Sequence, residues 1–249
     1  MDRLTLLIVI LLMGVANTHA QKFPDRGVPL ISNYTPEHYG RVGKVWDIQS
    51  ANNGIVYFAS DQGLLEYDGQ RWRSYEGSKG FTRSLLIAAD SVLYSGADKD
   101  FGRWKRDDFA QFSFTSLNPF RESTKGLNEE FWGTYQIEED YVFVSFDNIY
   151  VYRKGQLTKI AAPSRFYGSF TSGGKIYLFD EESGLYEFDG LSLTQRFNFP
   201  PSYTTSPVIV GIHNSREGLL IVTRSAGTFQ FADGSLRPLA NEVTPFLER

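Results

Sequence analysis

Residues 60–69 read SDQGLLEYDG, and residues 181–190 read EESGLYEFDG. Each stretch holds a polar loop, a glycine, an alternating apolar segment and then Asp-Gly. A third version, RSAGTFQFADG, occupies residues 224–234. Asp-Gly between alternating strands predicts a two-residue hairpin, because a type I′ turn needs positive φ at both central residues. The predicted hairpin turns are Asp68-Gly69, Asp189-Gly190 and Asp233-Gly234, with Lys154-Gly155 as a weaker variant.

The sequence around the repeated phrase extends it to five units. Positions matched between successive units are 36 to 48 residues apart, and they are Leu64, Phe101, Ile149, Leu185 and Thr228. Periods in this range with strand content are typical of β-propeller blades. We therefore expect an all-β propeller of about five four-stranded antiparallel blades. The expected blades are residues 45–75, 82–117, 131–162, 166–197 and 208–240.

The two ends of the chain differ from the repeats. Residues 1–20 combine Arg3, an apolar run from Leu4 to Val15 and small residues before Gln21. This pattern predicts a secretory signal peptide cleaved after Ala20, and the run is shorter than the about 20 residues that span a bilayer. We expect no membrane span in the mature segment.

We expect residues 21–44 to form a lead-in strand or closure segment. No segment after the fifth unit could cover its apolar flank, and repeat arrays normally cap their ends. We therefore expect an incomplete ring from a longer chain, with residues 241–249 starting the link to a missing sixth blade.

Composition excludes several kinds of site. The 249 residues include no Cys, which excludes thiol catalysis, Fe–S clusters and Cys-rich zinc sites. The three histidines are His19, His38 and His213, whose spacing does not suggest a metal site. The net charge is −4 and no basic tract stands out, so we expect no nucleic-acid contact. We expect no cofactor and no metal.

Several motifs occur in the order of a known family. They include Asn33-Tyr34, Trp46-Asp47-Ile48, Tyr57-Phe58, Gly63–Gly69 with Trp72, GADKDFGRW at 96–104 and TRSAGTFQFADG at 223–234. In this the chain resembles bacterial sensor-regulators with two-component-regulator propeller repeats and a triple-tyrosine domain. It departs from the family pattern at Thr228, where Leu is usual. Ala232, inserted before Asp233-Gly234, is expected to loosen the last hairpin.

The resemblance implies a periplasmic ligand-sensing propeller that is not itself catalytic. Family members continue with further blades, the triple-tyrosine domain, a transmembrane helix and a kinase or DNA-binding output. The implied partners are a small-molecule or oligosaccharide ligand and those downstream domains, with the full-length protein anchored in the inner membrane. A homodimer is also open.

Ligand contacts are expected at the starts of inner strands and on the turns after second strands, because both reach one end of a propeller. Concave sites commonly combine aromatic platforms with charged groups. The candidate ligand-binding residues are Trp46, Asp61, Arg83, Trp132, Tyr167, Asp180, His213 and Arg224. The aromatic members could equally pack between blades, and the arginines could form structural salt bridges.

Two other functions stay open. Acidic residues cluster after the second strands, at Asp61, Asp98, Asp100, Asp147 and 180–182. A secreted hydrolase or lyase acting on carbohydrate would use two of them, and would lose rate when Asp61 or Asp180 becomes Asn. A passive interaction scaffold would show neither a downstream transmembrane helix nor turnover.

Overall fold

The computed structural model describes residues 31–77, 80–89, 92–119, 129–200 and 207–240. It divides into a unit ending at Thr35 and a unit beginning at Pro36. The expected signal peptide and residues 241–249 lie outside the described residues. Of the expected lead-in strand or closure segment, residues 31–44 are described, and they hold one helical turn, α2 (Pro36–Tyr39). No helix in the described ranges is long and apolar enough to cross a membrane.

The described residues of the unit from Pro36 form twenty strands in five four-stranded antiparallel sheets, here called blades one to five. Blade one consists of β1 (Val45–Ser50), β2 (Val56–Ser60), β3 (Gly63–Tyr67) and β4 (Trp72–Glu76). Blade two consists of β5 (Thr82–Ile87), β6 (Leu93–Ala97), β7 (Phe101–Arg106) and β8 (Phe112–Ser116). Blade three consists of β9 (Phe131–Ile137), β10 (Asp140–Ser145), β11 (Asn148–Arg153) and β12 (Gln156–Ala161).

Blade four consists of β13 (Phe166–Ser172), β14 (Lys175–Asp180), β15 (Gly184–Phe188) and β16 (Leu193–Phe197). Blade five consists of β17 (Ile209–Ser215), β18 (Gly218–Thr223), β19 (Thr228–Ala232) and β20 (Ser235–Pro238). Within each blade, strands that follow one another in the chain pair antiparallel. The predicted all-β propeller class is confirmed.

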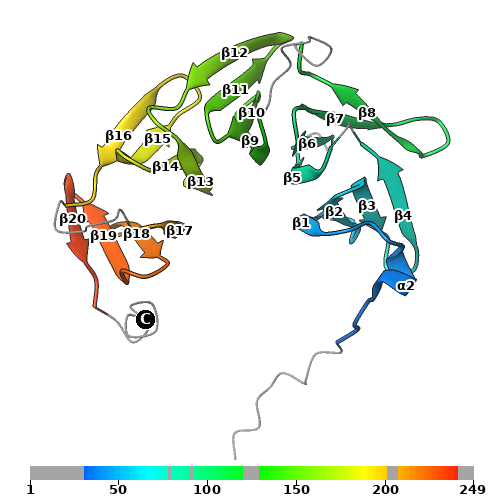
Figure 1. The fold of residues 1–249 in the computed structure, drawn as a ribbon, viewed down its shortest axis with the longest axis horizontal. Helices are drawn as coiled ribbons and strands as arrows, with labels where there is room; N and C mark the ends of the chain where they lie inside the picture. Colours follow the sequence, from blue (N-terminus) through cyan, green and yellow to red (C-terminus); the bar gives the residue numbers. More distant parts are fainter. Residues whose placement is uncertain (1–30, 78–79, 90–91, 120–128, 201–206, 241–249) are drawn as a thin grey trace, which may run out of the picture. The chain divides into compact units, whose positions relative to one another are not determined.

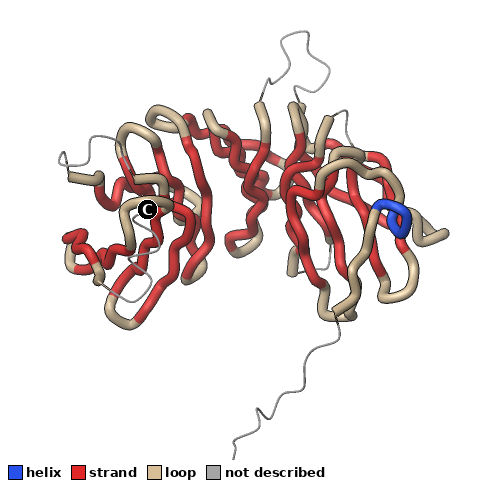
Figure 2. Tube along the Cα trace, turned by 60° about the horizontal axis from the view of Figure 1, so that its bottom comes forward, coloured by secondary structure: helices blue, strands red, loops and turns tan. Residues whose placement is uncertain are grey.

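Neighbouring blades meet through their innermost strands. β1 packs beside β5, β5 beside β9, β9 beside β13, and β13 beside β17. Figure 1 shows these first strands along the inner side of the arc that the blades of this unit form. The strands run between two ends where the turns gather (Figure 2), so residues at equivalent positions of successive blades reach the same end.

The core lies between the blades and explains why the repeated phrase recurs. Four apolar clusters fill the interfaces between successive blades. Four matched positions of the repeat lie in these interfaces: Leu64 is 1% exposed, and Phe101, Ile149 and Leu185 are 0% exposed. The fifth, Thr228, is 6% exposed, belongs to none of the four clusters and donates its hydroxyl to the Leu239 carbonyl at 2.7 Å. Blades one to four therefore each supply one buried side chain at this position to the interface with the next blade.

The hairpin turns differ from the expected type in two blades. Gly69 and Gly190 have positive φ, but Asp68 and Asp189 do not, so the type I′ prediction is wrong there. The Asp68 carboxylate instead accepts the amides of Gln70 and Arg71 at 3.0 and 2.7 Å. An Asp side chain that bonds its own turn in this way supports a longer loop.

The turns that were expected to be weak have the tight geometry. Lys154 and Gly155 have φ of 47° and 85°, and Asp233 and Gly234 have φ of 50° and 72°. Ala232 continues β19 and pairs with Ser235, so it does not loosen the last hairpin.

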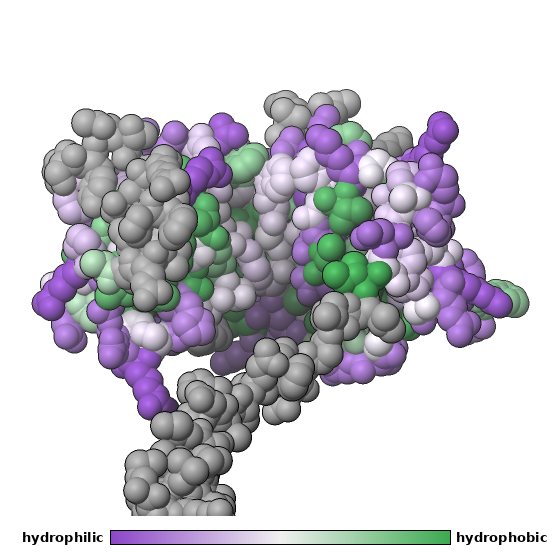
Figure 3. All heavy atoms as spheres, turned by 90° about the horizontal axis from the view of Figure 1, so that it is seen from below, coloured by the Kyte–Doolittle hydropathy of each residue, from purple (hydrophilic) through white to green (hydrophobic). Residues whose placement is uncertain are grey.

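A group of packed aromatic rings lies on the side of blade one that faces away from blade two. Trp72 packs on Tyr67 at 4.4 Å and on Phe58 and Tyr39 at 5.4 Å between ring centroids. Ile48 of β1 is 56% exposed. Figure 3 shows apolar residues exposed on its right half, the side on which blade one lies in Figure 1.

Candidate functional site

A β-bulge near the start of each innermost strand builds the candidate site. In every blade, the first strand has one residue more than the second strand between two successive paired positions. The extra residues are Trp46, Arg83, Trp132, Tyr167 and Val210. A bulge re-aims its side chain and is common beside functional sites. Four of the sequence-predicted residues therefore share one structural position.

Small residues follow the bulge because the innermost strands approach one another there. Gly133, Gly168 and Gly211 come directly after the extra residue in blades three to five. A Cβ at Gly133 would lie 2.6 Å from Ser169 Oγ and 2.6 Å from the Tyr135 ring. The sequence Phe-Trp-Gly thus places an aromatic side chain where blade four crowds against blade three.

Blades one to three join at an arginine held between two indoles. The Arg83 guanidinium carbon lies 4.5 Å from the ring centroid of Trp46 and 4.5 Å from that of Trp132. The two indoles meet edge to face, with centroids 5.6 Å apart and an interplanar angle of 86°. A cation over an aromatic face contributes about 0.5–2 kcal/mol, more when it is desolvated. Arg83 is 8% exposed, whereas Trp132 is 39% exposed.

Carboxylates fix the orientation of these three side chains. Asp98 accepts Arg83 Nε at 2.7 Å and Nη2 at 3.3 Å. Asp61 accepts Trp46 Nε1 at 2.7 Å, and Glu130 accepts Trp132 Nε1 at 3.1 Å. We call Trp46, Asp61, Arg83, Asp98, Glu130 and Trp132 the rim cluster. Its charge pairing means that Arg83 positions the indoles and is not free to bind an anion.

An aromatic series continues from the rim cluster into blade four. Phe146, on the turn after β10, has its ring centroid 5.9 Å from that of Trp132 and 6.4 Å from that of Tyr167. The Arg165 guanidinium lies 4.7 Å from the Phe146 centroid and 5.8 Å from the Tyr167 centroid. Tyr167 is 48% exposed. Exposed aromatic rings beside a cation provide platforms for a ring-shaped ligand.

Trp132 borders two cavities. One, of about 560 Å³, lies along β1, β5 and β9 and is also lined by Trp46, Asp47 and Arg83. The other, of about 260 Å³, lies along β9, β13 and β17 and is also lined by Tyr167 and Arg224. Ligand sites are usually concave, with a few placed polar groups. The predicted residues Trp46, Arg83, Trp132, Tyr167 and Arg224 therefore gather around two adjoining hollows.

One carboxylate lines the larger cavity. Burial raises the pKa of the Asp47 carboxyl, although the amides of Leu85 and Ile48 donate to it at 2.8 and 2.7 Å. Burial also raises the pKa of Tyr135 in this cavity to about 12, so its phenol stays protonated. Among the described residues lining this cavity, Asp47 is the only acid. Glycoside hydrolysis commonly needs two carboxylates, so this cavity fits binding better than cleavage.

Two predicted residues lie outside this arrangement. Asp180 is 0% exposed and accepts hydrogen bonds from the segments before β13 and after β14, so its role is structural. His213 is exposed on β17 and lines neither cavity. No group of three or more metal-ligating side chains occurs in the described part of the chain.

The sequence analysis missed Phe146, Glu130 and Arg165. Phe146 occupies the same position after the second strand as Asp61 and Asp98, but attention to acidic residues hid it. Glu130 and Arg165 stand two residues before the bulge, where no repeated residue type marks them. Aligning the units on the bulge places Phe146 with Asp61 and Asp98, whereas Glu130 and Arg165 align with Lys44, Phe81 and Val208.

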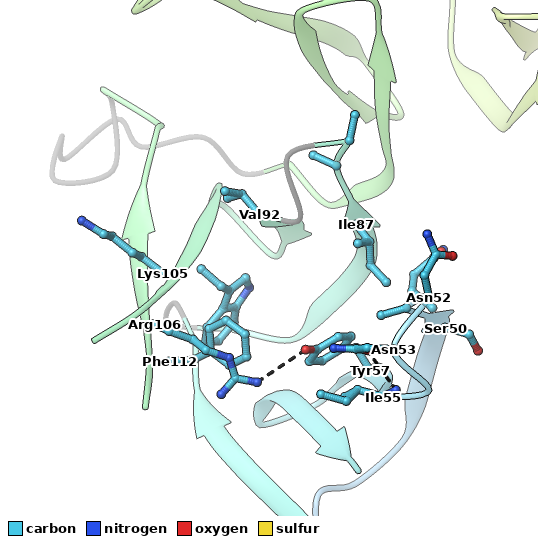
Figure 4. A pocket seen from close by; sticks show the side chains of 15 residues that line it. Ser50, Asn52, Asn53, Ile55, Tyr57, Ile87, Val92, Lys105, Arg106 and Phe112 are labelled. Atoms are coloured by element: carbon cyan, nitrogen blue, oxygen red, sulfur yellow. Dashed lines mark hydrogen bonds between the residues drawn. The ribbon is translucent and has the colours of Figure 1, made fainter. Parts of the chain in front are cut away.

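A third cavity is occupied by a structural ion pair. It has a volume of about 740 Å³ and lies between blades one and two, at the end of β1 opposite Trp46 (Figure 4). Arg106 reaches across it to the Tyr57 hydroxyl at 3.4 Å and pairs with the fully buried Glu66. Since its guanidinium is already neutralised, this cavity is the weaker candidate.

Replacing Arg83 by Met tests the rim cluster. We expect Arg83→Met to lower the free energy of unfolding by about 1–3 kcal/mol, because cation–π contacts and charge-assisted hydrogen bonds are lost. The tryptophan fluorescence should also shift, since a charge beside two indoles is removed. The control is Arg103→Met in the same blade, whose exposed side chain should be replaceable without either change. Unchanged fluorescence in Arg83→Met would contradict the assigned stacking.

Comparisons with known proteins bear on the fold. No protein-family model matches the chain, and no curated protein matches it. The extracellular domain of the hybrid two-component system BT4673 from B. thetaiotaomicron is 15% identical with a TM-score of 0.58, over 80% of this chain and 28% of that chain. Virginiamycin B lyase from Staphylococcus aureus is 13% identical with a TM-score of 0.58, over 81% of this chain and 71% of that chain.

The WD40 propeller domain of Doa1 is 13% identical with a TM-score of 0.55, over 78% of this chain and 67% of that chain. At these identities the likeness shows the β-propeller fold alone. The chain spans only 28% of the length of the BT4673 domain. The neighbours thus include both an extracellular domain of a two-component system and a lyase, and similarity by itself does not separate these functions.

Proposed function

We propose that the chain is the exported, ligand-sensing propeller module of a signal-transduction or transcription regulator, and that it binds its ligand without catalysis. The observation that carries this proposal is the placement of Trp132, which Arg83 and Glu130 orient and which borders two cavities. The ligand is a small molecule or oligosaccharide held against exposed aromatic rings.

The sensor context has two supports. The sequence motifs resemble the opening of two-component-regulator propellers, and one structural neighbour is the extracellular domain of a two-component system. The first twenty residues have the pattern of a signal peptide, which fits a periplasmic module.

The proposal includes a longer protein. The exposed apolar side of blade one, with Ile48, fits packing against a further sheet. We propose that further blades and a triple-tyrosine domain complete the extracellular part, and that an inner-membrane anchor links it to the output domain.

A secreted enzyme is the second candidate, because Asp47 has a raised pKa in the larger cavity and a lyase is among the structural neighbours. A group with a perturbed pKa in a cleft is a candidate acid or base. This reading predicts turnover by the isolated chain that is lost in Asp47→Asn. The sensor reading predicts no turnover by either protein.

Fractionation of cells followed by immunoblotting of the native gene product tests the sensor reading. We expect a membrane-associated band much larger than 28.2 kDa. A soluble band at 28.2 kDa would contradict it and would move the enzyme and the scaffold ahead.

A further inference from the structure

Two arginines lie at the same end of the blades as the rim cluster, and their guanidinium groups have no acidic partner within the described residues. Arg165 stands before β13 and Arg224 follows β18, and neither forms an ion pair within the described part of the chain. Arg83, at the same end of the blades, is instead neutralised by Asp98 and Glu130. An arginine presented without a counter-charge beside a cavity is available to a ligand.

One of the two arginines lines the 260 Å³ cavity, and the other contacts aromatic rings that line it. Arg224 lines it directly. Arg165 stacks on Phe146 and approaches Tyr167, and both of these rings line it. The nearest acidic residues in sequence are Asp180, whose carboxylate accepts the Arg165 backbone amide at 3.0 Å, and Glu181, whose amide donates to the Arg165 carbonyl at 3.0 Å. The Glu181 carboxylate does not pair with the Arg165 guanidinium within 4.0 Å.

The remaining walls are mostly apolar or aromatic, with Ser145 and Ser169 as the other polar residues. The apolar and aromatic residues include Trp132, Val208, Ile209 and Val210. A volume of about 260 Å³ is below the usual range for drug-sized ligands, so it suits a single ring. Guanidinium groups match the planar geometry of carboxylates, and they stack on aromatic faces at the same time.

We propose that this cavity recognises a carboxylate carried on a single ring, with Arg224 and Arg165 as the anion-binding groups and Trp132, Phe146 and Tyr167 as the ring platform. The inference rests on the proposed ligand-binding function and names the chemical class of the ligand. The ring belongs to a sugar acid or to a non-sugar cyclic acid, and both carry the negative charge that the two arginines bind.

The test compares acids with their neutral amides by isothermal titration calorimetry on the whole chain. The probes are glucuronate with glucuronamide, and cyclohexanecarboxylate with cyclohexanecarboxamide. We expect at least one acid to bind about 10-fold more tightly than its amide, since one charge-assisted contact is worth about a factor of ten. Preference within the first pair or the second distinguishes a sugar acid from a non-sugar acid.

Variants separate the arginines from the general charge of the surface. Arg224→Gln and Arg165→Gln should each weaken binding of the acid about 10-fold and leave the amide unaffected. Arg216→Gln is the control, because Arg216 is exposed in the β17–β18 turn at the other end of blade five. It should bind both members of each pair as the wild type does.

Three outcomes would overturn the inference. These are binding of an amide as tightly as its acid, a preference for the acid that both arginine variants keep, and no binding of either acid at millimolar concentration. Binding of the amides alone would remove the anionic class but leave the proposed ligand-binding function standing. The immunoblot tests the sensor assignment independently of all three.

Discussion

Phe101→Ala is expected to lower the free energy of unfolding by about 3–5 kcal/mol, as replacement of a fully buried Phe usually does. Phe101 is 0% exposed between blades two and three. Its ring centroid lies 4.5 Å from that of Phe143, 4.8 Å from that of Phe131 and 5.3 Å from that of Tyr150. Truncation would open a cavity between blade two and three aromatic rings of blade three, and two packed sheets cannot easily close such a gap.

Urea denaturation followed by circular dichroism measures this effect. The matched control is Phe109→Ala, because Phe109 is 84% exposed in the β7–β8 turn. The control should unfold within about 0.5 kcal/mol of the wild type, as surface substitutions usually do. A loss below about 1 kcal/mol in Phe101→Ala would mean that this inter-blade interface is not packed as described.

Asp180→Asn is expected to lower the free energy of unfolding by about 2–4 kcal/mol at neutral pH, because a buried carboxylate that accepts several hydrogen bonds is replaced by an amide that must face some of those donors. Asp180 accepts the amides of Ser164 at 2.9 Å, Arg165 at 3.0 Å and Ser183 at 3.0 Å, and the Ser164 hydroxyl at 2.8 Å. It thereby fixes the segment that carries Arg165 and leads into the Tyr167 bulge.

The pH dependence of this effect has a defined sign. Burial alone would raise the pKa of Asp180, but the hydrogen bonds from Ser183 and Ser164 together outweigh it, so the pKa is lowered from 3.8. A carboxyl whose pKa is lower in the folded state stabilises the fold above its unfolded pKa and loses this contribution as pH falls through the folded value. The stability difference between wild type and Asp180→Asn should therefore be full above about pH 4 and shrink below it.

Thermal melts of both proteins from pH 7 down to acidic pH measure this difference. Glu181→Gln is the control, because it removes a carboxylate from the neighbouring, exposed position. It should melt with the wild type at neutral pH. Equal stability of wild type and Asp180→Asn at pH 7, or a difference that grows in acid, would contradict the structural role of Asp180.

The repeat made the blades predictable, because one buried residue recurs per unit and a glycine stands at the start of the third strand in blades one and four and directly before it in blade five. Turn geometry was less predictable. Asp-Gly is compatible with both a type I′ turn and a longer loop closed by the Asp side chain, and Asp68-Gly69 forms the longer loop. Lys154-Gly155, whose sequence signal is weaker, has positive φ at both residues, as a type I′ turn requires.

The position of the candidate site was predictable from the sequence, but the ion pairs within it were not. Recurrence at strand starts pointed to Trp46, Arg83, Trp132 and Tyr167, and the shared bulge explains why. Which acid neutralises which arginine depends on contacts between blades: Arg83 meets Asp98 and Glu130, whereas Arg224 meets neither. Asp180 shows the converse, since its place on a turn suggested a ligand contact while its burial makes it structural.

The most direct test of the account is a crystal structure of the chain with the compound that most raises its melting temperature, chosen from sugars, sugar acids and cyclic acids. The account predicts an intact ligand packed against Trp132 in one of the two cavities that this indole borders. A cleaved ligand at Asp47, or a ligand bound away from Trp132, would contradict it.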